Sequence, residues 1–183
     1  GVADAFDESK ENWRNEYAEL KGLLTENEYE SARASTLNAH YTSPTVIKAI
    51  YSAIENMGFR TGNILEPACG VGNFFGLVPE SMSKSKLYGI ELDSITGRIA
   101  KQLYQNVNIA VQGYEDSSLP DSFFDLAVGN VPFGNYGVSD KRYDKNHFMV
   151  HDYFFAKTLD KVRPGGIIAF VTSSGTMDKK NSA

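Results

Sequence analysis

Residues 63–74 of this chain, Asn63-Ile64-Leu65-Glu66-Pro67-Ala68-Cys69-Gly70-Val71-Gly72-Asn73-Phe74, set the fold that we expect. A short apolar strand over 63–66 ends in an acid, and two glycines two positions apart follow it. This pattern is typical of a tight turn where the backbone can approach a ligand closely. Position 75 is Phe, so the third glycine of a pyrophosphate-binding turn is missing. An acid at the strand end would repel a phosphate and attract an ammonium group.

The pattern of strand, turn and helix continues along the chain. Further apolar strands are predicted at 86–91, 107–111, 124–128 and 166–171, with helices at about 94–105 and 152–162. Alternating strands and helices indicate an α/β fold: a doubly wound, mostly parallel, Rossmann-like sheet. Because such domains usually carry further strands, we expect a domain truncated after its fifth strand.

The first third of the chain is predicted to be helical. Ser43-Pro44 opens a helix whose apolar face is Ile47, Ile50, Tyr51, Ile54 and Met57, and Gly58 is its stop signal. Before it, Trp13, Tyr17, Leu20 and Leu24 recur at helical spacing, and Thr25-Glu26-Asn27-Glu28 has the form of a capping box. We therefore expect a helical packing arm over residues 1–38 and one main domain over residues 39–183, incomplete at its C-terminal end.

Composition excludes several classes of protein. With 183 residues, 42% of them hydrophobic and 22% charged, the chain resembles an ordinary globular domain. It has no membrane-length apolar run and no signal peptide, and one cysteine cannot form an internal disulfide, so a cytoplasmic location is expected. Its net charge of −5 argues against bulk electrostatic binding of nucleic acid.

Two more positions carry chemistry at the predicted strand ends. Glu91 ends the second strand, 21 residues after Gly70, where such folds place an acid that accepts hydrogen bonds from ribose hydroxyls. Gly129-Asn130-Val131-Pro132-Phe133-Gly134 follows the fourth strand, and its proline indicates a loop at the ligand-binding edge of the sheet.

The motifs around Glu66 and Asn130 resemble those of the S-adenosylmethionine-dependent amino methyltransferases, adenine-specific DNA methylases in particular. His40-Tyr41-Thr42-Ser43-Pro44 is similar to a lead-in segment of that family, and residues 165–172 resemble its later strand. The wider amino-acid sequence, including residues 32–39 and 129–134, resembles the methylase portion of large mobile-element proteins that join an adenine methylase to a helicase.

The resemblance implies a role for each matching residue. The predicted catalytic loop is Asn130, Val131, Pro132 and Phe133. In it the Asn130 carboxamide oxygen and a backbone carbonyl of Val131 or Pro132 accept the two N–H groups of the target amine, and Phe133 stacks on a flipped base. The implied cofactor is S-adenosyl-L-methionine, bound by Tyr41, Thr42, Glu66, Ala68, Gly70, Gly72, Asn73, Glu91 and Glu115.

The sequence departs from the family pattern at two places. Val131 stands where the commoner loop has a proline, so a carbonyl is kept and rigidity is lost. The family's acid beside the cofactor adenine falls at Gly113, and Glu115 or Asp116 is the expected substitute.

Other residues have plainer interpretations. Cys69 is expected to be a small buried filler, and no metal site is expected from His147 and His151, which we interpret as surface or stacking residues. Residues 136–155 interleave Lys141, Arg142 and Lys145 with aromatics, which fits either a solvated loop or a nucleic-acid contact.

We therefore predict methylation of the exocyclic amino group of adenine in DNA, with DNA held mainly by regions outside this chain and with a possible linked helicase. The alternatives are methylation of an RNA base or a protein glutamine amide, and a non-catalytic cofactor- or DNA-binding module linked to a helicase.

Overall fold

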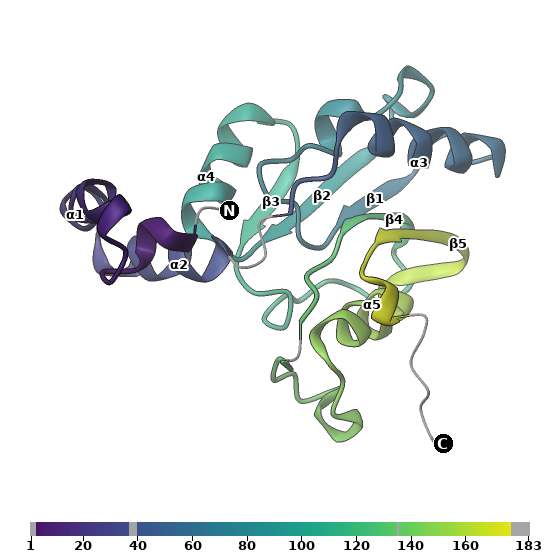
Figure 1. Ribbon diagram of the computed structural model, residues 1–183. Coiled ribbons are helices and arrows are strands. Elements are labelled where there is room, and N and C mark those ends of the chain that lie inside the picture. The colour runs from purple at the N-terminus through teal and green to yellow at the C-terminus, as the bar shows by residue number, and fades with distance from the viewer. Residues whose placement is uncertain (1–2, 37–39, 135, 177–183) are drawn as a thin grey trace.

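The computed structural model describes residues 3–36, 40–134 and 136–176, and within these ranges the chain forms one five-stranded parallel sheet (Figure 1). The strand order is β3-β2-β1-β4-β5. The strands are β1 (Asn63–Glu66), β2 (Lys86–Glu91), β3 (Asn108–Val111), β4 (Phe124–Asn130) and β5 (Val162–Val171). The doubly wound α/β fold predicted from the sequence is therefore confirmed.

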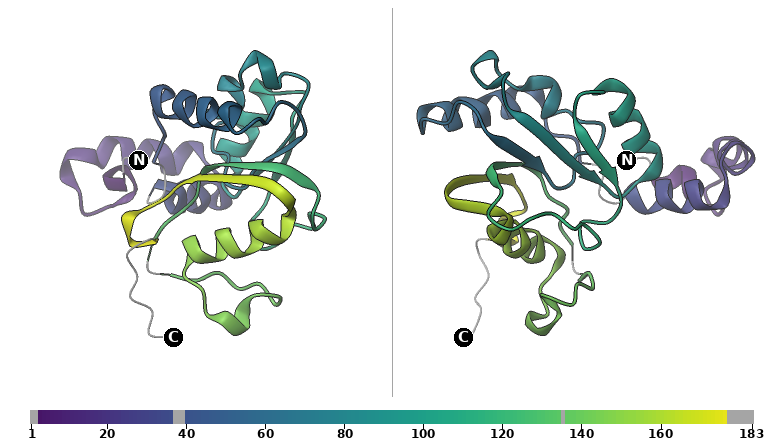
Figure 2. Two further views of the ribbon diagram at one scale, coloured as in Figure 1. Left: turned by 90° about the vertical axis from the view of Figure 1, so that its right-hand side faces the viewer. Right: turned by 180° about the vertical axis from the view of Figure 1, so that it is seen from behind.

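Helices cover both faces of the sheet, as Figures 1 and 2 show. The strand side chains alternate between the faces. Ile64, Leu126 and Val128 pack with helix α3 (Pro44–Asn56), whereas Leu65 and Ala127 pack with helix α5 (Val150–Lys161). Helix α4 (Ser94–Leu103) packs Ala100 against Cys69, Phe75 and Ile109 in a third, smaller cluster.

Helix α3 begins and ends where the sequence predicts. The Ser43 hydroxyl accepts a hydrogen bond from the Val46 N–H at 3.4 Å, Pro44 occupies the first turn, and Gly58 follows the helix with φ +94°. The predicted apolar face is correct except at Met57. Met57 lies at the C-cap and is 69% exposed, because the last turn extends past the edge of the core.

The N-terminal helices are α1 (Arg14–Leu23) and α2 (Glu26–Thr36). The predicted capping box is present: the Thr25 N–H donates to Glu28 Oε2 at 3.1 Å, and the Glu28 N–H donates to Thr25 Oγ1 at 3.3 Å. Helix α2 packs against α4, where Arg98 forms an ion pair with Glu28 at 2.8 Å. The predicted boundary at residues 38 and 39 lies outside the described residues.

The remaining differences from the predicted elements are local. Two 3₁₀ turns, Phe75–Leu77 and Glu80–Met82, lie between β1 and β2. Strand β4 continues through Gly129 to Asn130, which pairs with Val171 of β5. Strand β5 starts at Val162, immediately after α5. Other 3₁₀ turns are Ala3–Phe6, Glu11–Trp13, Asp144–Asn146 and Ser174–Thr176. Within the described ranges, no helix combines the length and apolar character needed to cross a membrane.

Candidate functional site

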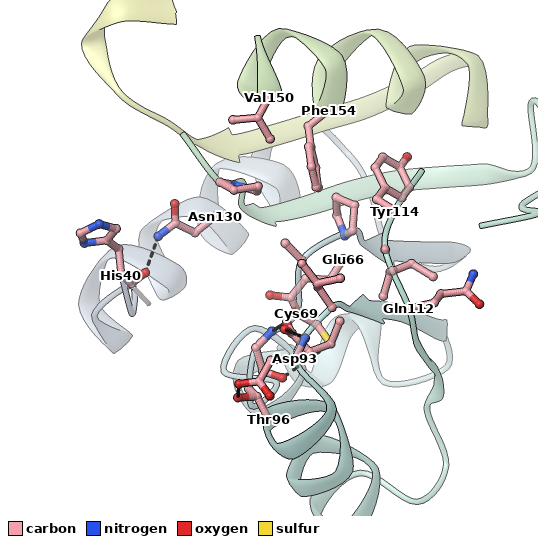
Figure 3. Close-up of a pocket in the computed structure, with 18 of the residues that line it drawn as sticks. His40, Glu66, Cys69, Asp93, Thr96, Gln112, Tyr114, Asn130, Val150 and Phe154 are labelled. Carbon is pink, nitrogen blue, oxygen red and sulfur yellow. Dashed lines mark hydrogen bonds between the residues drawn. The ribbon is translucent and has the colours of Figure 1, made fainter. Parts of the chain in front are cut away.

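A pocket lies where the carboxyl ends of β1, β2, β3 and β4 meet, closed on one side by α5 (Figure 3). Parallel strands of a doubly wound sheet place their ligands at this edge. Ten of the residues singled out in the sequence line it: Tyr41, Thr42, Glu66, Ala68, Gly70, Asn73, Glu91, Glu115, Asn130 and Pro132.

The glycine turn is held tightly against β2. The Cys69 N–H donates to the Ile90 carbonyl at 2.9 Å, and the Gly70 N–H donates to Glu91 Oε2 at 2.7 Å. Gly70 has φ +54°, a left-handed conformation that glycine adopts readily. Gly72 does not line the pocket. A Cβ there would lie 2.5 Å from the Tyr104 ring, so Gly72 serves packing between the turn and α4.

Glu66 is the most deeply buried acid of the pocket. Glu66 is 2% exposed, and its Oε2 has no hydrogen-bond partner among the described residues. Burial, together with the nearby Glu91 carboxylate, raises the pKa of Glu66 well above its ordinary value near 4.5. A buried acceptor of this kind becomes favourable when a cationic hydrogen-bond donor reaches it.

Glu91 has a different environment at the end of β2. One carboxylate oxygen accepts from Gly70 as described, and the other accepts from the Asp93 N–H at 2.8 Å. Burial raises the pKa of Glu91, while these backbone hydrogen bonds oppose the rise. Each oxygen keeps a lone pair, so Glu91 can order the turn and still accept a hydroxyl hydrogen bond.

The end of β3 departs from the family pattern in a way that its geometry explains. Gly113 carries no side chain, and a Cβ built there would collide with the carboxyl group of Glu115. The Glu115 carboxylate thus occupies the space beside position 113. This placement supports the prediction that Glu115 substitutes for the acid missing at Gly113.

Asn130, the last residue of β4, has an amide whose two ends differ. Its Nδ2 donates to the His40 carbonyl at 2.6 Å, as Figure 3 shows, while its Oδ1 is buried without a partner among the described residues. Turning the amide over would bring two oxygen acceptors together. The contact with His40 therefore fixes the oxygen as the free end.

The other residues of the predicted catalytic loop differ in position. Pro132 lines the pocket, but Val131 is 1% exposed and belongs to the core, where its N–H donates to the Val171 carbonyl at 3.2 Å. Phe133 does not line the pocket and stacks on His40, with ring centroids 5.0 Å apart. A target base would have to meet the free face of Phe133 or displace His40.

Several pocket residues escaped sequence reasoning. Val150 and Phe154 of α5 form one wall, and Asp93, the N-cap of α4, lies beside Glu91. Val150 and Phe154 are four residues apart on one helix face, a spacing that equally fits a core contact. Their role in the pocket depends on which part of the fold α5 packs against, and residue spacing alone does not predict that.

Cys69 and the two histidines do not form a reactive centre. Cys69 is 4% exposed, and burial raises the pKa of its thiol, as expected for a filler. His147 is exposed, but His151 is 5% exposed, so the surface interpretation was wrong for His151. Among the described residues, no cluster of three His, Cys, Asp or Glu side chains could hold a metal ion.

The hypothesis of a basic, aromatic nucleic-acid contact at 136–155 fails for two of its residues. Arg142 forms ion pairs with Asp121 at 2.8 Å and with Asp160 at 2.9 Å. Tyr143 is 7% exposed and donates its hydroxyl to Asp160 at 2.6 Å. Both side chains anchor the segment to α5. Arg142 is exposed but ion-paired, and Lys141 and Lys145 are the exposed basic residues of the predicted set for which the described residues provide no ion pair.

The fold and the site together define a class of protein. It has a doubly wound sheet, and one pocket at the carboxyl edge of that sheet holds the turn after Glu66, a second acid at Glu91 and Asn130. The family model described as N-6 DNA Methylase matches residues 23–183, and the chain belongs to that family. The resemblance seen in the sequence is thereby confirmed.

Three relatives and one solved structure show how far the similarity extends. The chain is 29% identical over 157 residues to the "Defense against restriction protein B" of Escherichia phage P1, covering 83% of this chain and 7% of that protein. It is 25% identical over 168 residues to a type I restriction enzyme methylase subunit of Methanocaldococcus jannaschii, covering 82% and 26%. It is 24% identical over 132 residues to an rRNA N(6)-adenosine-methyltransferase of Caenorhabditis elegans, covering 68% and 58%.

The solved structure is that of a protein from Listeria monocytogenes described as a "putative class i s-adenosylmethionine-dependent methyltransferase". It superposes with a TM-score of 0.63 at 16% identity, covering 94% of this chain and 62% of that one. The fold is thus that of S-adenosylmethionine-dependent methyltransferases, and the predicted cofactor is S-adenosyl-L-methionine. The chain spans about a quarter or less of the length of the two restriction-related relatives.

Proposed function

We propose that this chain is the cofactor-binding and catalytic part of an enzyme that methylates the exocyclic amino group of adenine in DNA. The proposal includes a base flipped out of the duplex and held by residues 130–133, since a stacked base could not enter the pocket. Family membership and the printed names of the phage and restriction relatives support DNA as the substrate.

The observation that carries the proposal is the buried Oδ1 of Asn130, which has no hydrogen-bond partner among the described residues and lies in the same pocket as Glu66. The adenine amine is a poor nucleophile because its lone pair is delocalised into the ring. An acceptor that takes one N–H bond, with a backbone carbonyl of the loop taking the other, favours a more tetrahedral nitrogen with a usable lone pair. Such hydrogen bonds strengthen as positive charge develops, so they favour the transition state.

The pocket also fits the charge of the cofactor. S-adenosyl-L-methionine supplies an electrophilic methyl group on a sulfonium when bound. Glu66 Oε2, which is buried without a partner among the described residues, would accept a hydrogen bond from the ammonium of its methionine moiety. Glu91 would accept a ribose hydroxyl, and Glu115 would lie beside the adenine. Positioning the amine and the methyl group about 3 Å apart would then provide most of the catalysis.

Methylation of adenosine in RNA is the second candidate. The rRNA-modifying relative aligns over 68% of this chain, more than a short shared motif would give. The group that the pocket would bind is the exocyclic amine of adenine, and adenine occurs in both DNA and RNA. The choice between DNA and RNA depends on surfaces that bind the backbone, and the chain's net charge of −5 provides little general attraction for either.

The test is transfer of a labelled methyl group by the full-length protein. Duplex DNA, rRNA fragments and a glutamine-containing protein should be offered in parallel, with mass spectrometry of the digested product. N6-methyladenine in DNA alone is the expected result. Labelled RNA alone would establish the second candidate, and label in protein would contradict both. No transfer to any acceptor despite tight binding of S-adenosylhomocysteine would favour a binding module.

A further inference from the structure

Helix α5 carries a buried lysine that connects two walls of the pocket. Lys157 is 3% exposed, and its ammonium donates to the Tyr114 carbonyl at 2.7 Å, the Glu115 carbonyl at 3.1 Å and Asp140 Oδ2 at 2.9 Å. A lysine ammonium has three donors, and all three are used here. A fully bonded buried charge is expensive to assemble and strongly fixes the groups around it.

The first two acceptors belong to the cofactor side of the pocket. Tyr114 and Glu115 both line it, directly after β3. Lys157 binds their backbone carbonyls, so it fixes the main chain of the segment on which the Glu115 carboxylate is mounted. The Glu115 side chain remains available to the pocket, whereas the Tyr114 ring is buried in the core and its hydroxyl lies 3.1 Å from Thr158 Oγ1.

The third acceptor, Asp140, lies in the segment 136–149 and does not line the pocket itself. Asp140 also accepts the Tyr153 hydroxyl at 2.8 Å and the Arg142 N–H at 3.1 Å. Burial disfavours the Asp140 carboxylate, but the hydrogen bonds from Lys157 and Tyr153 outweigh burial and hold its pKa below the ordinary value. Asp140 belongs to the segment that follows the predicted catalytic loop, and Tyr136 and Val138 of the same segment line the pocket.

We infer that Lys157 is a positioning residue that couples occupancy of the cofactor pocket to the order of residues 136–149. A cofactor that fixes Glu115 and its main chain also fixes Lys157, and Lys157 holds Asp140. Cofactor binding would therefore pre-order the wall beside which the target base enters. The inference rests on the proposed function, because it takes the pocket as the cofactor site.

The chain provides a matched control four residues away on α5. Lys161 is 6% exposed, and its ammonium donates to the Leu119 carbonyl and Asp121 Oδ1, both at 2.7 Å. Leu119 and Asp121 do not line the pocket. Lys157→Met and Lys161→Met therefore remove the same kind of buried, bonded ammonium, and only the first removes one that bonds residues lining the pocket. Lys161 is connected to residues 136–149 through Asp121, which also pairs with Arg142, but neither of its own acceptors lies on the cofactor side.

The experiment measures S-adenosylhomocysteine binding by calorimetry and amide hydrogen exchange with and without saturating S-adenosylhomocysteine. In the wild type, exchange across 136–149 should slow when the ligand is bound. Lys157→Met should weaken binding by about tenfold, within the usual range of coupling between sites, and should abolish the slowing even at saturation. Lys161→Met should keep the affinity within about twofold and keep the slowing.

A second variant separates coupling from folding. Asp140→Asn keeps the two carbonyl contacts of Lys157 and weakens only the link to 136–149, so binding should persist while the slowing of exchange is lost. Wild-type protein that fails to bind S-adenosylhomocysteine would overturn the proposed function. Binding without any slowing at 136–149, slowing retained in Asp140→Asn, or equal losses in the two lysine variants would overturn the coupling alone.

Discussion

Buried polar groups occur in two regions of this molecule, and the two regions treat them in opposite ways. Around α5, Lys157 and Lys161 are almost fully buried, and each ammonium has partners within hydrogen-bond distance. His151 of the same helix is the exception, because both of its ring nitrogens are buried without a hydrogen-bond partner among the described residues. In the pocket, Glu66 Oε2, Asn130 Oδ1 and Thr42 Oγ1 are buried without any partner among the described residues.

The difference separates structure from function on physical grounds. A buried polar atom without a partner costs about 1–3 kcal/mol, and in a pocket a bound ligand can recover that cost by supplying the missing hydrogen bond. We therefore interpret the buried lysines of α5 as structural, and the pocket as a binding site whose acceptors can bond to donors of a ligand. Substitutions in the first region should accordingly change mainly stability, with Lys157 as the exception because it also bonds residues that line the pocket, and substitutions in the second should change binding or turnover.

The largest effect is expected from Asp140→Ala. It leaves the Lys157 ammonium buried without its counter-charge, which should lower the free energy of unfolding by about 3–5 kcal/mol. Urea denaturation followed by circular dichroism measures it. Asp116→Ala, at an exposed position, is the control and should change stability by no more than about 0.5 kcal/mol. Equal effects of the two substitutions would show that the buried ion pair is not what holds this region.

Asn130→Ala, in the pocket, should lower turnover and leave stability largely unchanged. Removing the carboxamide oxygen should lower turnover by about 10²–10³-fold, the size seen when one preorganised polar contact is lost. Affinity for S-adenosylhomocysteine should change far less. Single-turnover methylation and calorimetry on the same preparation provide both values. Near-normal methylation by Asn130→Ala would sink the amine-activation role assigned to this residue.

Glu66→Gln should make the empty protein more stable and a poorer binder of cofactor. Because the pKa of Glu66 is raised in the folded state, the unfolded chain loses this proton first as pH rises above about 4.5. The wild type therefore loses stability from that pH upward until the folded-state pKa is passed, and the glutamine variant should lack this loss.

Cofactor affinity of Glu66→Gln should fall by about 1.5–3 kcal/mol, the value of a hydrogen bond to a charged group. Thermal melts between pH 4 and pH 8, alone and with S-adenosylhomocysteine, test both halves. A variant that is less stable than the wild type at pH 8 would show that Glu66 has a structural partner after all.

The smallest effect is expected from Phe133→Ala. Loss of one aromatic platform should weaken capture of a flipped base by about 1–3 kcal/mol while leaving cofactor affinity unchanged. Binding of an oligonucleotide with a mismatched target adenine, monitored through 2-aminopurine fluorescence, measures the step. Because Phe133 stacks on His40 in this structure, His40→Ala is the informative companion. If neither substitution alters base capture, Phe133 acts elsewhere.

The sequence was sufficient for everything that depends on local chemistry. Alternating strands and helices, the Ser43-Pro44 helix start, the Thr25 capping box and the acid-glycine turn all follow from neighbours within a few residues. These local signals placed the carboxyl ends of the strands, and hence most of the pocket residues, because parallel strands bring those ends to one edge.

Contacts between distant segments required the folded chain. Lys157 lies on a helix, and its spacing gives no sign that it meets carbonyls 42 and 43 residues earlier. Arg142 and Tyr143 looked available to nucleic acid, yet Asp121 and Asp160 bind them. The free end of Asn130 was likewise settled by His40, 90 residues away. A sequence specifies which groups can bond, but burial and the pairing of remote groups arise only when packing brings them together.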